Sequence, residues 1–81
     1  MAKIAVDKST SEIIDILPDG HTFSDREQEL FDIHNVYDSG IEAMNTEIDT
    51  YYKTNQAIGG TEIKGIKKYY IDGVLSWQTV Q

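Results

Sequence analysis

The sequence contains no cysteine, only one proline and no long apolar run. Without cysteine, the chain has no disulfide framework, no thiolate zinc site and no cysteine nucleophile. No segment approaches the roughly 18 apolar residues that a membrane-spanning helix needs, so we expect no membrane partner. The N-terminal segment Met1–Asp7 reaches an acidic side chain too early for a secretory signal peptide, which favours an intracellular protein.

The chain has 81 residues, 40% of them hydrophobic and 26% charged, a composition typical of one small globular domain. We therefore expect a single domain over residues 1–81. Its net charge is −7, and the acidic residues are concentrated in the first fifty positions. An acidic surface repels phosphate backbones, so no nucleic-acid partner is expected. The charge either keeps a small protein in solution or attracts a basic partner.

Residues 3–17 have the pattern of a β-hairpin. Ile4 and Val6 alternate with smaller or polar residues, as in a strand with one covered face. In the returning strand, Ile14 and Ile16 are expected to share that face.

Turn chemistry marks the next segment. Asp19-Gly20 ends the hairpin, and Ser24 and Glu27 have the spacing of a capping box, which predicts a short helical turn. Residues 30–37 could extend that helix or form a strand. Their alternation of apolar and polar residues favours a strand.

A helix is predicted from about Gly40 to Asn55, with Asp38 or Ser39 as its cap and its end near Gly59-Gly60. Its apolar face is given by residues at helical spacing: Ile41, Met44, Ile48, Tyr51 and Tyr52.

The C-terminal segment is predicted to be a second hairpin. Residues 66–71 and 74–80 are rich in strand formers, and Asp72-Gly73 between them favours a type I′ turn. The expected fold class is α+β: a small antiparallel sheet from two β-hairpins, with a middle strand if residues 30–37 are extended, packed on one amphipathic helix.

The residue types that carry catalysis or bind metals occur without the required spacing. His21 and His34 are the only histidines, and no zinc or calcium motif surrounds them. No serine lies in a nucleophile motif. We therefore expect no enzymatic activity and no cofactor or metal site.

A surface that binds another protein is a better candidate for the functional site. Adjacent tyrosines, at 51–52 and 69–70, cannot both enter a small core, and tyrosine and tryptophan are enriched where proteins bind each other. An outer tyrosine could instead only shield backbone and expose its hydroxyl. The candidate protein-interface residues are Tyr52, Tyr69, Tyr70 and Trp77.

Residues 2–27 resemble the openings of small tailed-bacteriophage proteins. The shared pattern is a strand, K-x-T-x-E/G, a second strand, D-G or D-H, an aromatic residue and S-x-x-E. Here it is carried by Lys8 to Glu12, Asp19-Gly20, Phe23, and Ser24 with Glu27, and the chain departs from it after Phe31. The resemblance implies a protein of virion morphogenesis, such as a head-decoration, head–tail or small capsid-associated protein, and carries over no functional residue.

Two functions are therefore expected. The first is a non-enzymatic phage structural or assembly protein, a minor virion component located in the virion or the host cytoplasm. It would contact other virion proteins or a second copy of itself, for example by strand addition at the first or last hairpin. The alternative is a small acidic inhibitor of a host nucleic-acid-binding enzyme or defence system. It would present Asp38, Glu42 and Asp49, which share one stripe of the predicted helix.

Overall fold

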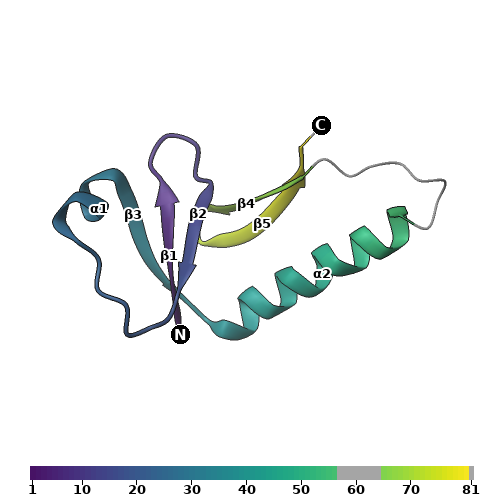
Figure 1. The fold of residues 1–81 in the computed structure, drawn as a ribbon, viewed down its shortest axis with the longest axis horizontal. Helices are drawn as coiled ribbons and strands as arrows, with labels where there is room; N and C mark the ends of the chain where they lie inside the picture. Colours follow the sequence, from purple (N-terminus) through teal and green to yellow (C-terminus); the bar gives the residue numbers. More distant parts are fainter. Residues whose placement is uncertain (57–64, 81) are drawn as a thin grey trace.

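The computed structural model describes residues 1–56 and 65–80, and Figure 1 shows their arrangement. In chain order the elements are β1 (Ala2–Asp7), β2 (Ile13–Leu17), α1 (Asp25–Leu30), β3 (Phe31–Val36), α2 (Asp38–Gln56), β4 (Ile66–Ile71) and β5 (Val74–Thr79). All strand pairs are antiparallel. The α+β fold class is thus confirmed.

The strands form two sheets. One has three strands in the order β2-β1-β3, and the other is the β4–β5 hairpin. A backbone bridge between Glu12 and Tyr69 links them. The two predicted hairpins therefore exist, but they lie in separate sheets. The strand predicted over residues 30–37 joins the first of them.

A β-bulge changes the inward face of β2. Ile4 pairs with Ile16, so regular alternation would place Ile14 opposite Val6, but the partner of Val6 is Ile13. The extra residue shifts the alternation by one position. Ile14 is consequently 48% exposed, while Ile13 packs against the core. The prediction that Ile14 faces the core is wrong for this reason.

The capping box predicted for α1 is present. The Ser24 hydroxyl accepts a bond from the Glu27 N–H at 3.2 Å, and the Glu27 carboxylate accepts one from the Ser24 N–H at 3.1 Å. The N–H of Phe31 then donates to the carbonyl of Glu27. That bond closes the helix and places Phe31 at the start of β3, which confirms the strand.

Helix α2 begins two residues earlier than predicted. The Tyr37 carbonyl accepts bonds from the N–H groups of Gly40 and Ile41, so Asp38 and Ser39 lie in the first turn and do not cap it. The predicted helix end near Gly59-Gly60 lies outside the described residues.

The β4–β5 hairpin turns as predicted. Asp72 and Gly73 have φ angles of 52° and 78°, the left-handed values that a type I′ turn requires at both positions.

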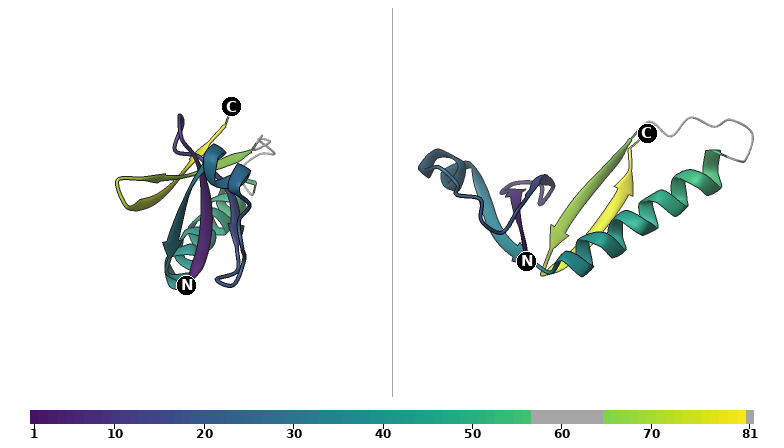
Figure 2. Two further views of the ribbon diagram at one scale, coloured as in Figure 1. Left: turned by 90° about the vertical axis from the view of Figure 1, so that its left-hand side faces the viewer. Right: turned by 60° about the horizontal axis from the view of Figure 1, so that its bottom comes forward.

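The core lies where the elements meet. Its buried residues come from β1, β3 and α2: Ile4, Val6, Val36, Ile41, Met44 and Ile48. Of the residues whose burial the structure describes, only Ile4 has an exposed fraction of 0%. Helix α2 and the β4–β5 hairpin extend away from the three-stranded sheet (Figure 2), so the molecule measures 47 × 25 × 21 Å. Its radius of gyration is 14.3 Å, whereas a compact chain of this length has about 12 Å. The molecule is thus elongated and has a small core.

Candidate protein-interaction site

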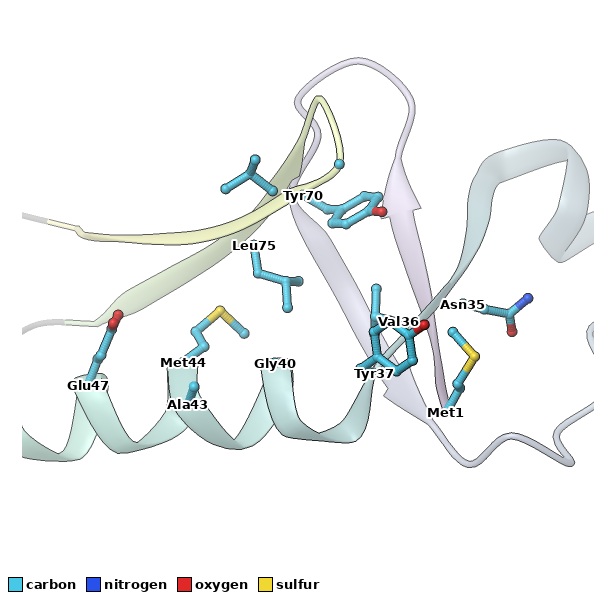
Figure 3. A pocket seen from close by; sticks show the side chains of 12 residues that line it. Met1, Asn35, Val36, Tyr37, Gly40, Ala43, Met44, Glu47, Tyr70 and Leu75 are labelled. Atoms are coloured by element: carbon cyan, nitrogen blue, oxygen red, sulfur yellow. The ribbon is translucent and has the colours of Figure 1, made fainter.

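A groove of about 520 Å³ lies where β3, α2 and the β4–β5 hairpin meet. Figure 3 shows it between the hairpin, the first turns of α2 and the end of β3. Most of its lining is apolar, contributed mainly by Val36, Tyr37, Met44, Tyr70, Val74 and Leu75. We call this surface the apolar groove.

The rim of the apolar groove exposes large apolar side chains. Tyr37 is 72% exposed and Val74 is 62% exposed. Tyr37 lies between β3 and α2 with its carbonyl committed to the helix start, so the chain turns there and leaves the ring outside. Val74 directly follows the turn of the hairpin. A concave apolar surface with exposed rings on its rim is typical of a binding site.

Tyr70 forms a wall of the groove. Its ring centroid lies 4.9 Å from that of His34 on β3, and its backbone N–H donates to the carbonyl of Ser11 at 3.0 Å. These contacts hold the hairpin against the three-stranded sheet. Contacts within the protein therefore hold Tyr70 in place without a bound partner.

The hairpin is also attached to α2. The Trp77 indole N–H donates to the Glu47 carboxylate at 3.1 Å, and the Trp77 ring packs edge-to-face on Tyr51 with centroids 5.3 Å apart. Closer to the groove, a Cβ on Gly40 would lie 3.2 Å from the Leu75 side chain. Glycine at this position permits the close approach of α2 and β5.

The predicted interface residues have mainly structural contacts. Tyr52, Tyr70 and Trp77 pack partly buried against the core, and Tyr69 forms the bridge to Glu12. Of these four, Tyr70 alone lines the apolar groove.

The two exposed rim residues were not among the predicted interface residues. The signals for Tyr37 and Val74 were positional: a tyrosine directly before a helix start, and a valine directly after a hairpin turn.

Comparisons with protein-family models, with curated proteins and with solved structures find no match. Within residues 1–56 and 65–80, no helix combines the length and the apolar composition of a membrane-spanning segment.

The described residues offer little for metal binding or acid–base chemistry. No three His, Asp or Glu side chains in this part of the chain are placed to share an ion. Two carboxylates are perturbed, and both support local structure. Hydrogen bonds from the Ser9 hydroxyl and from the N–H groups of Thr10 and Ser9 lower the pKa of Asp7. Bonds from Ser24 lower the pKa of Glu27 within the capping box.

The acidic stripe expected on the long helix is present on α2. Asp38, Glu42 and Asp49 are all exposed. Asp38 and Glu42 also flank a second hollow of about 360 Å³, whose lining includes Leu17 and Ile41. One carboxylate oxygen of Asp38 lies 3.8 Å from the N-terminal amino group of Met1.

Proposed function

We propose that the protein is a non-enzymatic assembly protein that works through protein–protein contacts, as a minor virion component of a tailed phage. The observation that carries this proposal is the apolar groove with Tyr37 exposed on its rim. The resemblance of residues 2–27 to small tailed-phage proteins supports the virion assignment.

The chemistry of the groove favours binding. Its one carboxylate side chain, Glu47, accepts the Trp77 indole bond, and the rest of its surface is largely apolar. Covering exposed apolar area stabilises a complex by about 25 cal/mol per Å² before the costs of association. A domain with a small core also gains stability from a bound partner.

The first test is mass spectrometry of gradient-purified particles from the phage or induced host that encodes the chain. We expect the protein in the particles in stoichiometric amounts. Its absence from particles, together with abundance in infected cells, would contradict the virion assignment.

The second test identifies the surface used. A photoreactive benzophenone amino acid replaces Tyr37 in the groove or, as a matched control, Ile14, which is 48% exposed on β2. We expect a crosslink to one virion protein from position 37 and none from position 14. Equal crosslinking from both positions would show that the groove is not the contact surface.

One observation favours the inhibitor as a second candidate. The carboxylates of Asp38 and Glu42 flank an apolar hollow, an arrangement suited to a lysine or arginine stem with its charged head. Binding of a basic nuclease groove through these groups should weaken strongly in about 1 M salt. Undiminished binding there would exclude this mechanism.

A further inference from the structure

Strand β3 is an outer strand of the three-stranded sheet, and the direction of its backbone groups follows from β1. The Asp7 N–H donates to Glu12 at 2.8 Å and the Asp7 carbonyl accepts from Ser11 at 2.9 Å, both on the β2 side. Backbone groups alternate along a strand, so those of Val6 point to β3, where its partner is Asp32. Asp32 and every second residue after it therefore bond to β1.

The intervening residues of β3 point away from the sheet. The bond from the Phe31 N–H to Glu27 in α1 confirms this alternation, because Phe31 belongs to the outward set. The next outward residues are Ile33 and Asn35. Helix α1 thus closes the edge at Phe31. No other bond within residues 1–56 and 65–80 uses the outward N–H and C=O groups of Ile33 and Asn35, which leaves them available for another strand.

The other edges are interrupted or partly covered. On β2, the bulge interrupts the strand at Ile14. The Ile16 N–H donates to the Asp15 carboxylate at 2.9 Å, and Pro18 directly follows the end of the strand. On β4, the Tyr70 N–H is bonded to Ser11. Strand β5 runs along α2. None of these features interrupts the β3 edge at Ile33 and Asn35.

The available edge borders the apolar groove. Asn35 and Val36 line the groove together with Val74 of the hairpin. A strand added beside β3 would extend the sheet, and its alternate side chains would enter the groove. Backbone pairing and apolar burial would therefore act on the same segment.

Charge indicates the chemistry of that segment. Among the described residues that line the groove there is no lysine or arginine, whereas Glu47 is one of them, and Asp72 lies beside the lining residue Gly73. The chain as a whole carries −7, so a second copy would be repelled. A basic segment is attracted by the same field.

We propose that β3 takes up an extended segment of a partner protein, one that alternates apolar and basic residues, as a fourth strand of the sheet. The proposal rests on the proposed function, because the segment would belong to the assembly partner. The apolar side chains enter the groove, and the basic side chains lie on the opposite face of the added strand, where the net charge of −7 attracts them.

The probe is a synthetic peptide of about seven residues that alternates lysine and valine, with blocked ends. Two controls test the backbone: the same peptide N-methylated at its lysines, or at its valines. A third control replaces lysine with glutamate. Binding is followed by ¹⁵N NMR and by amide exchange, at peptide concentrations up to the millimolar range.

We expect the lysine–valine peptide to slow exchange at the Ile33 and Asn35 amides. One N-methylated peptide should bind at least about tenfold more weakly and the other should be little affected, because only alternate amides face β3. The glutamate peptide should also bind about tenfold more weakly or worse.

Two protein variants complete the design. Asn35→Pro removes an outward N–H that no described residue uses, and Val74→Asp places a charge on the groove rim; both should weaken binding while thermal melting shows a folded protein. Ile14→Asp, on the interrupted strand β2, should bind like the parent chain.

Several outcomes would overturn the proposal. They are unchanged exchange at Ile33 and Asn35, equal binding of all the peptides, or sedimentation showing that the chain alone dimerises and protects these amides. Presence in particles without peptide binding would overturn this inference and leave the proposed function standing. Peptide binding by a protein that is absent from particles would support this inference and contradict the virion assignment.

Discussion

Two aromatic residues of similar size have different roles here. Trp77 is half-buried against the core and bonded to Glu47, whereas Tyr37 is 72% exposed. We expect Trp77→Ala to lower the free energy of unfolding by about 3 kcal/mol, since it removes a packed ring. Tyr37→Ala should change it by less than about 0.5 kcal/mol. Urea denaturation measures both.

The conservative variant Trp77→Phe separates packing from hydrogen bonding. It keeps a ring in place and loses the bond to Glu47, so a loss of about 1 kcal/mol is expected. If Trp77→Ala were as mild as Tyr37→Ala, Trp77 would be a surface residue and the hairpin would be held to α2 by other contacts.

Asp7 links stability to pH through the first hairpin turn. Its carboxylate accepts bonds from Ser9 and Thr10, which lower its pKa below the ordinary value of 3.8. A pKa depressed by folding means that ionised Asp7 stabilises the protein above its unfolded-state pKa, and that this contribution is lost as the pH falls through the folded-state pKa.

The parent chain should therefore exceed Asp7→Asn in stability near neutral pH, and the gap should narrow below about pH 4. Urea denaturation between pH 2.5 and 7 measures the gap. Ser9→Ala retains the carboxylate but removes a donor, so its acid dependence should be weaker than that of the parent. A gap between parent and Asp7→Asn that stays constant with pH would show that the turn bonds do not depend on the charge.

At the scale of the element, the bulge in β2 determines which isoleucine is buried. Ile13 packs against the core and Ile14 is exposed. Ile13→Asp should lower the free energy of unfolding by more than about 2 kcal/mol, because it places a carboxylate against apolar side chains. Ile14→Asp should cost less than about 1 kcal/mol. The reverse order in urea denaturation would mean that β2 pairs without the bulge.

Local chemistry was sufficient to predict most elements. The Asp72-Gly73 turn, the capping box at Ser24 and the apolar spacing of α2 each correspond to an observed feature, because each depends on neighbours in the sequence. The bulge at Ile14 and the division into two sheets depend on contacts between distant segments, among them the bridge from Glu12 to Tyr69. No pattern within a short window specifies those contacts.

The candidate site was less predictable for the same reason. The packing of the β4–β5 hairpin on β3 and α2 places Tyr70 and Trp77 against the core, which the sequence pattern alone does not specify. The exposed rim residues, Tyr37 and Val74, lie at junctions between elements. Their exposure depends on the angle at which those elements meet.

At the scale of the molecule, a small core and an elongated shape point to marginal stability. Ile4 is the only large side chain among the described residues that is fully buried, and the radius of gyration is 14.3 Å. A ligand that binds the folded state alone raises stability by mass action. The free energy of unfolding of the isolated chain should therefore rise measurably when a partner fills the apolar groove.

The lysine–valine peptide allows a quantitative test of this coupling. At about ten times its dissociation constant, it should stabilise the fold by about 1.4 kcal/mol. For a domain of this size that corresponds to a rise in Tm of about 6–11 °C, measured by circular dichroism. Val74→Asp, whose charge lies on the groove rim, should show little rise at the same peptide concentration, and Ile14→Asp should show the full rise. An equal rise in both variants would place the peptide elsewhere on the acidic surface, because only a segment seated in the groove contacts Val74.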